Sequence, residues 1–303
     1  MNHNRKNFRN PLFIVNSKAG KLTTKEKLNQ INYCCSGQQF DVCFPKSPTE
    51  TENLSQIAFK ENRLVIACGG DGVVNLVANQ AIKYNGTMSI LPLGRGNDFA
   101  KSIGILLPED LKRVLEEPKV MKSRYLVLAF KDFDKICLTS AGVGLLSEAA
   151  FRASKIPLLQ GGLLYAVSAL ACFTNLKTHH YEIKLSGKNV LHEPLVIIVA
   201  ASTPFAGGGM FIAPEAGKEK GKLNLLYAGK VSRIEAIGLL KKVFSGNHLN
   251  HKKVTNLHLN DIYINTKEKT FWAPLVYGDG EYLGNLPVKI SVGGKPLNIL
   301  IPK

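Results

Sequence analysis

The run LVIACGGDGVVNLV, residues 64–77, places one carboxylate among three glycines directly after an apolar segment. Residues 64–68 are typical of a buried strand, and residues 73–83 are typical of a helix. Glycines permit positive φ angles and let backbone N–H groups approach a ligand closely. The helix that follows would direct further N–H groups and a partial positive charge at the same point, which favours phosphate. The run therefore predicts a strand–loop–helix unit with an anion-binding turn.

The same alternation extends on both sides of this unit. Strands are expected over residues 12–15, 40–44, 64–68 and 88–93, and helices over 24–35, 49–61 and 73–83. Strands that alternate with helices indicate a parallel, doubly wound sheet, in which ligands bind beyond the carboxyl ends of the strands. Three of those ends carry polar, glycine-containing loops: NSKAGK at 16–21, GGDG at 69–72 and GRGND at 94–98.

The pattern changes after about residue 122, where short strand-like runs joined by turn residues predominate. Strands are expected over 125–130, 135–140, 180–185, 190–201, 223–228, 254–259, 262–265 and 288–292. Helices are expected near 147–153, 163–176 and 233–244. This succession predicts a second, mostly antiparallel β domain.

Composition restricts the class of protein. The chain has 303 residues, 45% of them hydrophobic, and a net charge of +16. A packed core is therefore expected, together with an anionic partner such as nucleic acid, an acidic membrane or a phosphorylated ligand. No zinc finger, RNP-like strand or helix-turn-helix pattern is present, so nucleic acid is not expected. The six cysteines form no CxxC pair, and we expect reduced thiols in a cytosolic protein.

One apolar segment raises the question of a transmembrane helix. Residues 156–173, IPLLQGGLLYAVSALACF, are long enough for such an assignment. The segment contains Gln160, Gly161, Gly162 and Ser168, and much of the rest is alanine. We therefore expect a buried helix that starts near Gly162.

Asp71 permits two interpretations. An aspartate would repel phosphate unless a cation lay between them, so Asp71 can serve as a ligand of magnesium or of a magnesium-bound water. Alternatively, it caps an ordinary strand–helix turn. The GRGND loop opens a second helix and adds Arg95 and the pair Asn97-Asp98, and loops at neighbouring strand ends are expected to meet. A third strand end adds an amide and a cation, Asn16 and Lys18.

The stretch VYGDGEYLG, residues 276–284, places Asp279 and Glu281 on either side of one glycine. Asp-Gly is a common hairpin signal, which favours a simple turn. A carboxylate in such a turn can also accept the proton of an attacking hydroxyl group. The sequence leaves both interpretations open.

Taken together, these motifs resemble the bacterial diacylglycerol kinase and lipid kinase family, which is related to sphingosine and ceramide kinases. The landmarks follow the family's order and cover nearly the whole chain: VNSKAGK at 15–21, GGDGVVN at 69–75, LPLGRGNDFAKSIGI at 91–105, SAGVGLLSEA at 140–149, TPFAGGGMFIAPEA at 203–216, GNHLNHKKV at 246–254 and YGDGE at 277–281. GGDG alone is weak evidence, because NAD kinases and phosphofructokinases carry similar motifs. LPLGxxNDFA, GGGxxxAP and DGE in combination are specific.

The resemblance implies an α/β nucleotide-binding domain with a parallel sheet over residues 1–122, completed by 285–303. It also implies a mostly antiparallel β-sandwich domain over 123–284 and an active site in the cleft between the two. The implied reaction transfers the γ-phosphoryl group of ATP to a lipid hydroxyl, with diacylglycerol as the default acceptor.

The resemblance also implies the site residues. Magnesium would be held by Asp71, with Asp98 near it. Asp279 and Glu281 match the acidic pair from which the family draws its general base, and the sequence does not choose between them. The implied nucleotide-binding residues are Asn16, Lys18, Gly69, Gly70, Asp71, Gly72, Val73, Asn75, Gly94, Arg95, Gly96 and Asn97.

Several positions depart from the family pattern. Val73, Arg95 and Pro45 stand where threonines are expected, Leu76 replaces a glutamate, and Leu146 replaces an aspartate. Lys220 stands where an aspartate would bind a structural metal, so no structural magnesium is expected there. Arg95 adds a fixed positive fork that either binds phosphate or fills the space of the β-phosphate. These departures leave open a non-catalytic homologue that binds nucleotide or lipid. The shared GGDG motif leaves open an NAD kinase.

The expected helix over 233–244 bears on the membrane. Ile234, Ile237, Leu240 and Phe244 have spacings that can form an apolar stripe. Basic residues accompany the stripe: Arg233, Lys241, Lys242, His248, His251, Lys252 and Lys253. Apolar helical faces usually pack on a core, and a basic run can simply be solvated. The lipid substrate implied by the resemblance favours peripheral contact of a cytoplasmic protein with an anionic membrane. The sequence says nothing about oligomeric state.

Overall fold

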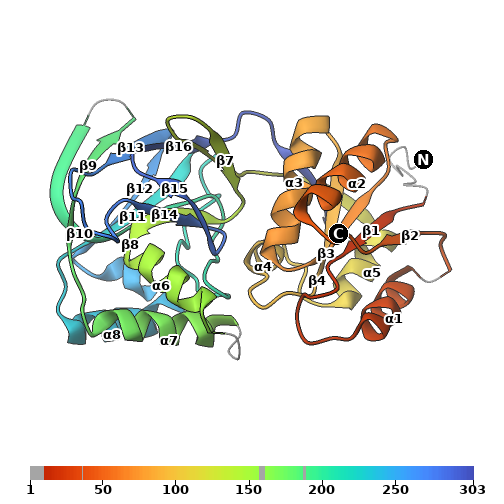
Figure 1. Ribbon diagram of the computed structural model, residues 1–303, viewed down its shortest axis with the longest axis horizontal. Coiled ribbons are helices and arrows are strands. Elements are labelled where there is room, and N and C mark those ends of the chain that lie inside the picture. Colours follow the sequence, from red (N-terminus) through yellow and green to blue (C-terminus); the bar gives the residue numbers. More distant parts are fainter. Residues whose placement is uncertain (1–9, 36, 157–160, 187–188) are drawn as a thin grey trace. The chain divides into compact units, whose positions relative to one another are not determined.

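The structure is a computed structural model that describes residues 10–35, 37–156, 161–186 and 189–303 (Figure 1). The chain divides into two compact units. Unit 1 comprises the residues up to Ser123 together with Lys295–Lys303, and unit 2 comprises Arg124–Gly294. Each unit has its own sheet.

Unit 1 is an α/β domain built on a six-stranded sheet with the order β2-β1-β3-β4-β17-β5. Five of the strands run parallel, and β5 is antiparallel to β17 at one edge. The strands are β1 (Leu12–Val15), β2 (Asp41–Cys43), β3 (Val65–Gly69), β4 (Thr87–Pro92), β5 (Pro118–Ser123) and β17 (Leu297–Pro302). The helices are α1 (Thr24–Cys35), α2 (Pro48–Lys60), α3 (Asp71–Tyr84), α4 (Asp98–Ser102) and α5 (Pro108–Glu116). The predicted parallel sheet is confirmed.

The sheet of unit 1 is buried on both faces. Every residue of β1 and of β3 is buried. Such continuous apolar strands are typical of a parallel sheet covered by helices on two sides. Two strands were not predicted, β5 and β17, and β17 places residues 297–302 between β4 and the edge strand β5.

Unit 2 contains an antiparallel sheet of eleven strands in the described part of the chain. The strands are β6 (Leu126–Ala129), β7 (Asp134–Cys137), β8 (Ser140–Gly144), β9 (His179–Leu185), β10 (Asn189–Ala201), β11 (Leu223–Gly229), β12 (Val254–Leu259), β13 (Asp261–Asn265), β14 (Leu275–Gly278), β15 (Glu281–Asn285) and β16 (Val288–Val292). Leu126 on β6 and Val276 on β14 belong to one buried cluster, although their strands are near opposite ends of the strand order. The sheet therefore closes over a shared core in the manner of a β-sandwich, as predicted.

Three helices of unit 2 lie on one side of its strands: α6 (Leu145–Ser154), α7 (Gly161–Phe173) and α8 (Arg233–Val243) (Figure 1). A 3-10 helix, η1 (Asn247–Asn250), follows α8. The apolar segment predicted as a helix from about Gly162 is α7, while its residues 157–160 lie outside the described residues. Within the described part of the chain, every helix is too short or too polar to cross a bilayer.

Two local expectations were wrong. The helix after GGDG begins at Asp71, not at Val73, and its N-cap is Gly70. The strand expected over residues 135–140 ends at Cys137, as β7. The next strand, β8, has the sequence SAGVG and lacks the β-branched pattern that is typical of the other strands.

Candidate active site

The loops that follow β1, β3 and β4 meet at the carboxyl edge of the sheet in unit 1. Strand β3 lies between β1 and β4. Directly after β1, Asn16 N–H donates to the Cys68 carbonyl of β3 (2.9 Å), and directly after β4, Leu93 N–H donates to the Gly69 carbonyl of β3 (3.0 Å). Parallel strands bring their carboxyl ends to one edge, so the three loops are neighbours.

Two glycines make this approach possible. A Cβ atom on Gly94 would overlap the Cα of Gly70, so the GGDG and GRGND loops touch through their backbones. A Cβ atom on Gly20 would overlap the carbonyl oxygen of Leu93, and Gly20 has a φ of 65°. Any larger residue at either position would separate the loops.

Asp71 connects two of these loops. Its carboxylate accepts a hydrogen bond from Asn97 N–H (2.9 Å) and a longer one from Phe99 N–H (3.5 Å). These donors belong to the GRGND loop and the start of α4, while the N-cap of α3, Gly70, makes no side-chain cap bond. The expectation that Asp71 simply caps its own helix is therefore wrong. The carboxylate holds the second loop against the first.

Asn97 closes the GRGND loop. It has a φ of 57°, in the left-handed region that asparagine tolerates better than most residues. Its Oδ1 accepts from Gly94 N–H (3.0 Å), and its Nδ2 donates to the Gly94 carbonyl (3.1 Å). Arg95 lies at the exposed tip of the loop so formed.

Carboxylate oxygens of Asp71 and Asp98 both lie close to Gly96. A Cβ on Gly96 would lie 2.8 Å from Asp71 Oδ2 and 3.7 Å from Asp98 Oδ2. The absence of that atom leaves space beside two carboxylates. Magnesium is usually bound by one or two carboxylates together with water and substrate phosphates, so this pair fits it. Among the described residues, no group of three or more histidine, cysteine, aspartate or glutamate side chains could hold a metal by itself.

The NSKAGK loop is held by a hydrogen bond within the loop and by hydrogen bonds from a buried lysine. Asn16 Oδ1 accepts from Lys18 N–H (2.9 Å), while the Lys18 side chain is exposed. Lys27 on α1 is fully buried, and its Nζ donates to the carbonyls of Asn16 (3.1 Å) and Ser17 (2.7 Å). Burial lowers the pKa of this ammonium group. Lys27 was not predicted, because nothing in its sequence neighbourhood distinguishes it from a surface lysine.

The other predicted nucleotide-binding residues lie in the first turns of α3. Gly72, Val73 and Asn75 are half-buried there. Asn75 Oδ1 accepts from Asn79 Nδ2 (2.7 Å), one turn further along the helix. Leu76 follows on the same helix, so the two apolar departures from the family pattern belong to this first part of α3.

Unit 2 carries the second acidic motif in a tight hairpin. Asp279 and Gly280, with φ angles of 49° and 80°, form the two-residue connection between β14 and β15. Two successive positive φ angles are the signature of a type I′ turn, for which Asp-Gly is a preferred pair. The hairpin interpretation is correct, and it leaves the chemical interpretation open.

The two carboxylates of this hairpin have different surroundings. Asp279 accepts hydrogen bonds from Leu138 N–H (2.7 Å), from Thr139 N–H (2.9 Å) and from the Thr139 hydroxyl (2.6 Å). Glu281 is exposed as a residue, yet the protein atoms around its carboxyl group remove part of its hydration. This desolvation, and then the neighbouring charge of Asp279, raise the pKa of Glu281 against the opposing effect of Lys135.

A tyrosine from α7 reaches this hairpin. A Cβ on Gly280 would lie 2.8 Å from the hydroxyl oxygen of Tyr165, and a Cβ on Gly207 would lie 3.5 Å from its ring. Tyr165 therefore lies between the acidic hairpin and the glycine run at 207–209. The sequence alone could not identify it, because α7 appears there only as an apolar helix.

Comparison with known proteins gives the same assignment for both units. Residues 10–123 match the diacylglycerol kinase catalytic domain, and residues 139–301 match the YegS C-terminal NAD kinase beta sandwich-like domain. The chain belongs to the diacylglycerol kinase and lipid kinase family.

Relatives in this lipid kinase family match most of the chain. A diacylglycerol kinase of Bacillus subtilis is 27% identical over 256 residues, which are 84% of this chain and 82% of that protein. A diacylglycerol kinase of Mycobacterium tuberculosis is 23% identical over 260 residues, 82% of this chain and 80% of that protein. The crystal structure of a diacylglycerol kinase from Bacillus anthracis superposes with a TM-score of 0.73 at 18% identity and covers 98% of each chain, which confirms the fold.

Proposed function

We propose that this protein is an ATP- and magnesium-dependent lipid kinase that phosphorylates the hydroxyl group of a lipid such as diacylglycerol. The observation that carries the proposal is the meeting of three glycine-containing loops around Asp71 in unit 1. Phosphoryl transfer needs positioning and charge neutralisation more than covalent chemistry. A rigid, glycine-lined edge with one tethered carboxylate supplies both.

The nucleotide belongs to unit 1 in this proposal. Backbone N–H groups of the GGDG and GRGND loops bind the phosphates, since glycine lets them approach without a side chain in between. Lys18 and Arg95 are exposed at the same loops and add positive charge. Arg95 suits a phosphate oxygen pair through its planar fork. Asp71 and Asp98 would hold magnesium, whose charge would neutralise that of the phosphates.

The acceptor belongs to unit 2. Glu281 is the better candidate for the general base, because the residue is accessible at the surface and the raised pKa of its partly desolvated carboxyl group makes it a stronger base than an ordinary glutamate. Asp279 already accepts three short hydrogen bonds from the β7–β8 turn, so its role is to fix the hairpin. The Tyr165 hydroxyl, beside Gly280, is placed to orient the hydroxyl of the acceptor.

A second candidate is a non-catalytic homologue that binds nucleotide or lipid. The observation that favours it is the apolar start of α3, where Val73 and Leu76 replace a hydroxyl and a carboxylate expected for the family. This candidate predicts ATP binding without transfer to any lipid. An NAD kinase would instead form NADP from NAD and ATP.

One assay separates these candidates. ATP labelled at the γ-phosphate is incubated with mixed micelles of diacylglycerol, monoacylglycerol, ceramide or sphingosine, with and without magnesium, and separately with NAD. We expect a labelled phospholipid that forms only with magnesium. Label in NADP would establish the NAD kinase. Absence of both products, with ATP binding confirmed by calorimetry, would replace our proposal with the non-catalytic homologue.

A further inference from the structure

Two helices of unit 2 pack against each other and leave their outer sides apolar. Helix α7 and helix α8 share a small buried cluster that contains Ala169, Phe173 and Ala236. At the other end of the pair, a Cβ on Gly162 would lie 2.9 Å from the ring of Phe244. The last turn of α7 thus adjoins the first turn of α8, and the first turn of α7 adjoins the end of α8. The helices are antiparallel neighbours.

The outer side of this pair carries six large apolar side chains, which we name the α7–α8 face. The exposed fractions are 62% for Leu163, 37% for Val167, 43% for Leu170, 83% for Ile234, 41% for Ile237 and 48% for Phe244. In each helix they recur at spacings of three, four or seven residues, which place them on one side. Large exposed apolar side chains gathered on two packed helices in this way mark an interaction surface.

Helix α7 has no charged residue at all. A helix that faces water normally carries polar residues on its outer side. Here the polar Ser168 points inward and is buried, while leucine and valine point outward. The expectation of a fully buried helix is therefore wrong for one side of α7, and the reversed polarity calls for an apolar partner.

The exposed charged side chains of α8 are positive. Arg233, Lys241 and Lys242 are exposed on α8, next to Ile234 and Ile237 at helical spacing. The one acidic residue of α8, Glu235, forms hydrogen bonds and an ion pair with neighbouring residues.

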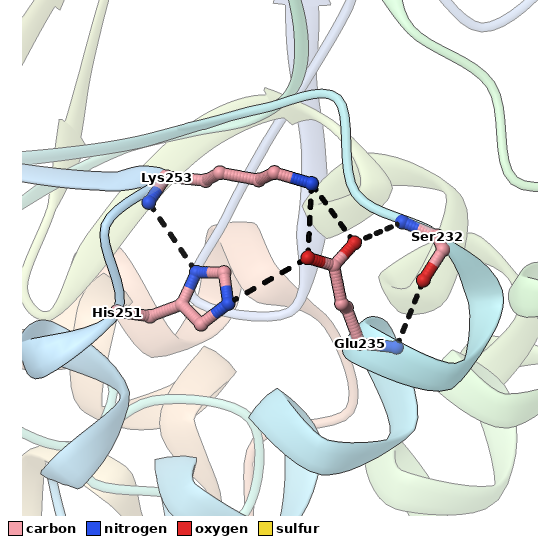
Figure 2. A network of polar contacts seen from close by, with 4 residues as sticks. All are labelled: Ser232, Glu235, His251 and Lys253. Carbon is pink, nitrogen blue, oxygen red and sulfur yellow. Dashed lines mark hydrogen bonds and ion pairs between the residues drawn. The ribbon is translucent and has the colours of Figure 1, made fainter.

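Figure 2 shows how Glu235 is held. Its carboxylate accepts from Lys253 Nζ at 2.9 Å through each oxygen and from Ser232 N–H at 2.7 Å, and His251 Nε2 lies 3.9 Å away. The hydrogen bonds from Ser232 and Lys253 lower the pKa of Glu235 to about 2. The negative charge of α8 is thus matched by Lys253, which directly precedes β12, and no acidic side chain of α8 is left to compensate its exposed cations.

We propose that the α7–α8 face docks the protein on an anionic lipid bilayer. A paired helical surface with apolar centre and basic margin is the pattern of interfacial membrane binding, in which apolar side chains enter the acyl boundary and cations contact anionic headgroups. A protein partner would require a complementary acidic margin of its own, whereas an anionic leaflet supplies this charge everywhere.

The choice of a bilayer also rests on the proposed function. Tyr165 belongs to the same helix, α7, and its hydroxyl lies beside Gly280 of the acidic hairpin. Helix α7 therefore links the docking face to the carboxylate that we assign to the acceptor. A lipid drawn from the bilayer would reach this hairpin along the helix that contacts the membrane.

The test measures binding of the intact protein to vesicles, independently of activity. Wild-type protein is sedimented with phosphatidylcholine vesicles and with vesicles that also contain phosphatidylglycerol. We expect binding to the mixed vesicles. Ile234→Ser with Ile237→Ser should lower the partition coefficient at least about tenfold. Lys241→Glu with Lys242→Glu should lower it at least about 25-fold, since each cation near the surface accounts for about a factor of five.

Control variants carry single substitutions of the same two kinds on unit 1. Ile57→Ser removes an isoleucine that is 55% exposed on α2, and Lys119→Glu reverses an exposed lysine on β5. Both controls should bind like wild type. Absence of wild-type binding, or equal binding of the face variants and the controls, would overturn the proposal. Self-association of the wild type that the face variants abolish, without vesicle binding, would assign the face to a second copy and also overturn it.

Activity assays separate this proposal from the proposed function. If the function is correct, the face variants should lose transfer to vesicle-borne diacylglycerol yet keep transfer to a soluble short-chain diacylglycerol. If no acceptor is phosphorylated while vesicle binding depends on the face, the docking proposal stands and the kinase proposal fails.

Discussion

Single side chains in unit 1 do two tasks at once. Asp71 organises the phosphate loops through Asn97 and Phe99, and it also presents an oxygen beside Gly96 and Asp98. A carboxylate already held by backbone N–H groups is fixed in orientation before any ligand arrives. Binding a cation there therefore costs little further side-chain entropy.

Asp71→Asn tests this residue. The amide keeps the volume and one acceptor oxygen but loses the charge, so we expect kcat to fall at least 100-fold with ATP and diacylglycerol. The folded state should lose about 1–2 kcal/mol, because a charge-assisted hydrogen bond becomes a neutral one. The readouts are labelled phosphate transfer and a thermal melt.

Asp41→Asn is the matched control for this experiment. Asp41 is an exposed carboxylate of the same unit, paired with Arg63 away from the loops. Its activity should stay within about twofold of wild type, since exposed ion pairs contribute roughly 0–1 kcal/mol. Normal turnover of the Asp71 variant would remove Asp71 from the mechanism.

The acidic hairpin gives a paired prediction at the same scale. Glu281→Gln should reduce kcat about 10²–10⁴-fold, the usual effect of losing a general base, while the protein stays folded. Asp279→Asn should instead destabilise unit 2 by about 1.5–3 kcal/mol, because its charge supports three hydrogen bonds. If Asp279→Asn kept its stability and Glu281→Gln kept its activity, the two roles would have to be exchanged.

The pKa of Glu281 determines the direction of the pH effects. Its folded pKa lies above the usual value of 4.5, so wild-type activity should fall on the acid side at a higher pH than an ordinary glutamate would cause. A raised carboxyl pKa favours the folded state below 4.5, and this benefit is lost as pH rises through the folded value. Glu281→Gln should therefore melt at or above the wild-type temperature at pH 8. Melting temperatures measured between pH 4 and pH 8 give the comparison.

At the scale of elements, α1 supports the nucleotide loop from behind. Lys27→Met preserves the buried stem but removes the donor to Ser17, whose carbonyl would lack this bond, while Asn16 keeps its bond from Ala19 N–H. We expect KM for ATP to rise about tenfold, since a lost net hydrogen bond is worth about 0.5–1.5 kcal/mol. We expect kcat to change little, because Lys27 is remote from the acceptor motif in the chain.

Lys25→Met is the control, because Lys25 is exposed on the same helix. Steady-state kinetics with varied ATP separate the two parameters. Equal KM values for both variants would show that the buried ammonium group of Lys27 does not fix the NSKAGK loop in its ATP-binding conformation.

The elements also show what the sequence can predict. Parallel strands and their loops were predictable, because β1, β3 and β4 are short, mainly apolar runs followed by glycine-containing loops. Strand β8, SAGVG, was not predictable, because its small residues have low strand propensity. They are required by close packing: a Cβ on Gly142 would overlap the Ile198 carbonyl of β10. Edge strand β5, PKVMKS, is largely exposed, and only its pairing with β17 makes it a strand.

The candidate site divides along the same line. The three loops and the acidic pair were predictable because their residues are close together in the sequence. The contributions of Lys27 and Tyr165 were not predictable, because each depends on a contact between residues that are separated in the sequence. Lys27 contacts carbonyl groups 10 and 11 residues before it, and Tyr165 on α7 lies beside the β14–β15 turn. Local patterns hold no information about such pairings.

At the scale of the whole molecule, unit 1 depends on both ends of the described chain. Strand β17 lies between β4 and β5, and Leu297, Ile299 and Leu300 are at most 1% exposed. Burying these three side chains contributes about 5–9 kcal/mol, comparable with the whole stability of a typical domain.

A chain that stops at Gly294 should therefore lose unit 1 but retain unit 2. We expect no ATP binding by calorimetry and rapid hydrogen exchange throughout β1, β3 and β4, while the amides of β9, β10 and β13 stay protected. Removal of the exposed Lys303 alone is the control and should change neither measurement. A truncated chain that still bound ATP would show that β17 is dispensable.

The position of β17 also bears on how the protein is made. Ribosomes release the N-terminal part of a chain first, and domains usually fold as they emerge. Here the segment up to Ser123 emerges early, yet β4 and β5 cannot acquire their shared neighbour until residues 295–303 have been synthesised. Two strand edges stay open during translation of all of unit 2, and open edges are sites of aggregation. Unit 1 is thus the first unit to be synthesised and cannot be the first to finish folding, so every nascent chain passes through a period in which it needs protection.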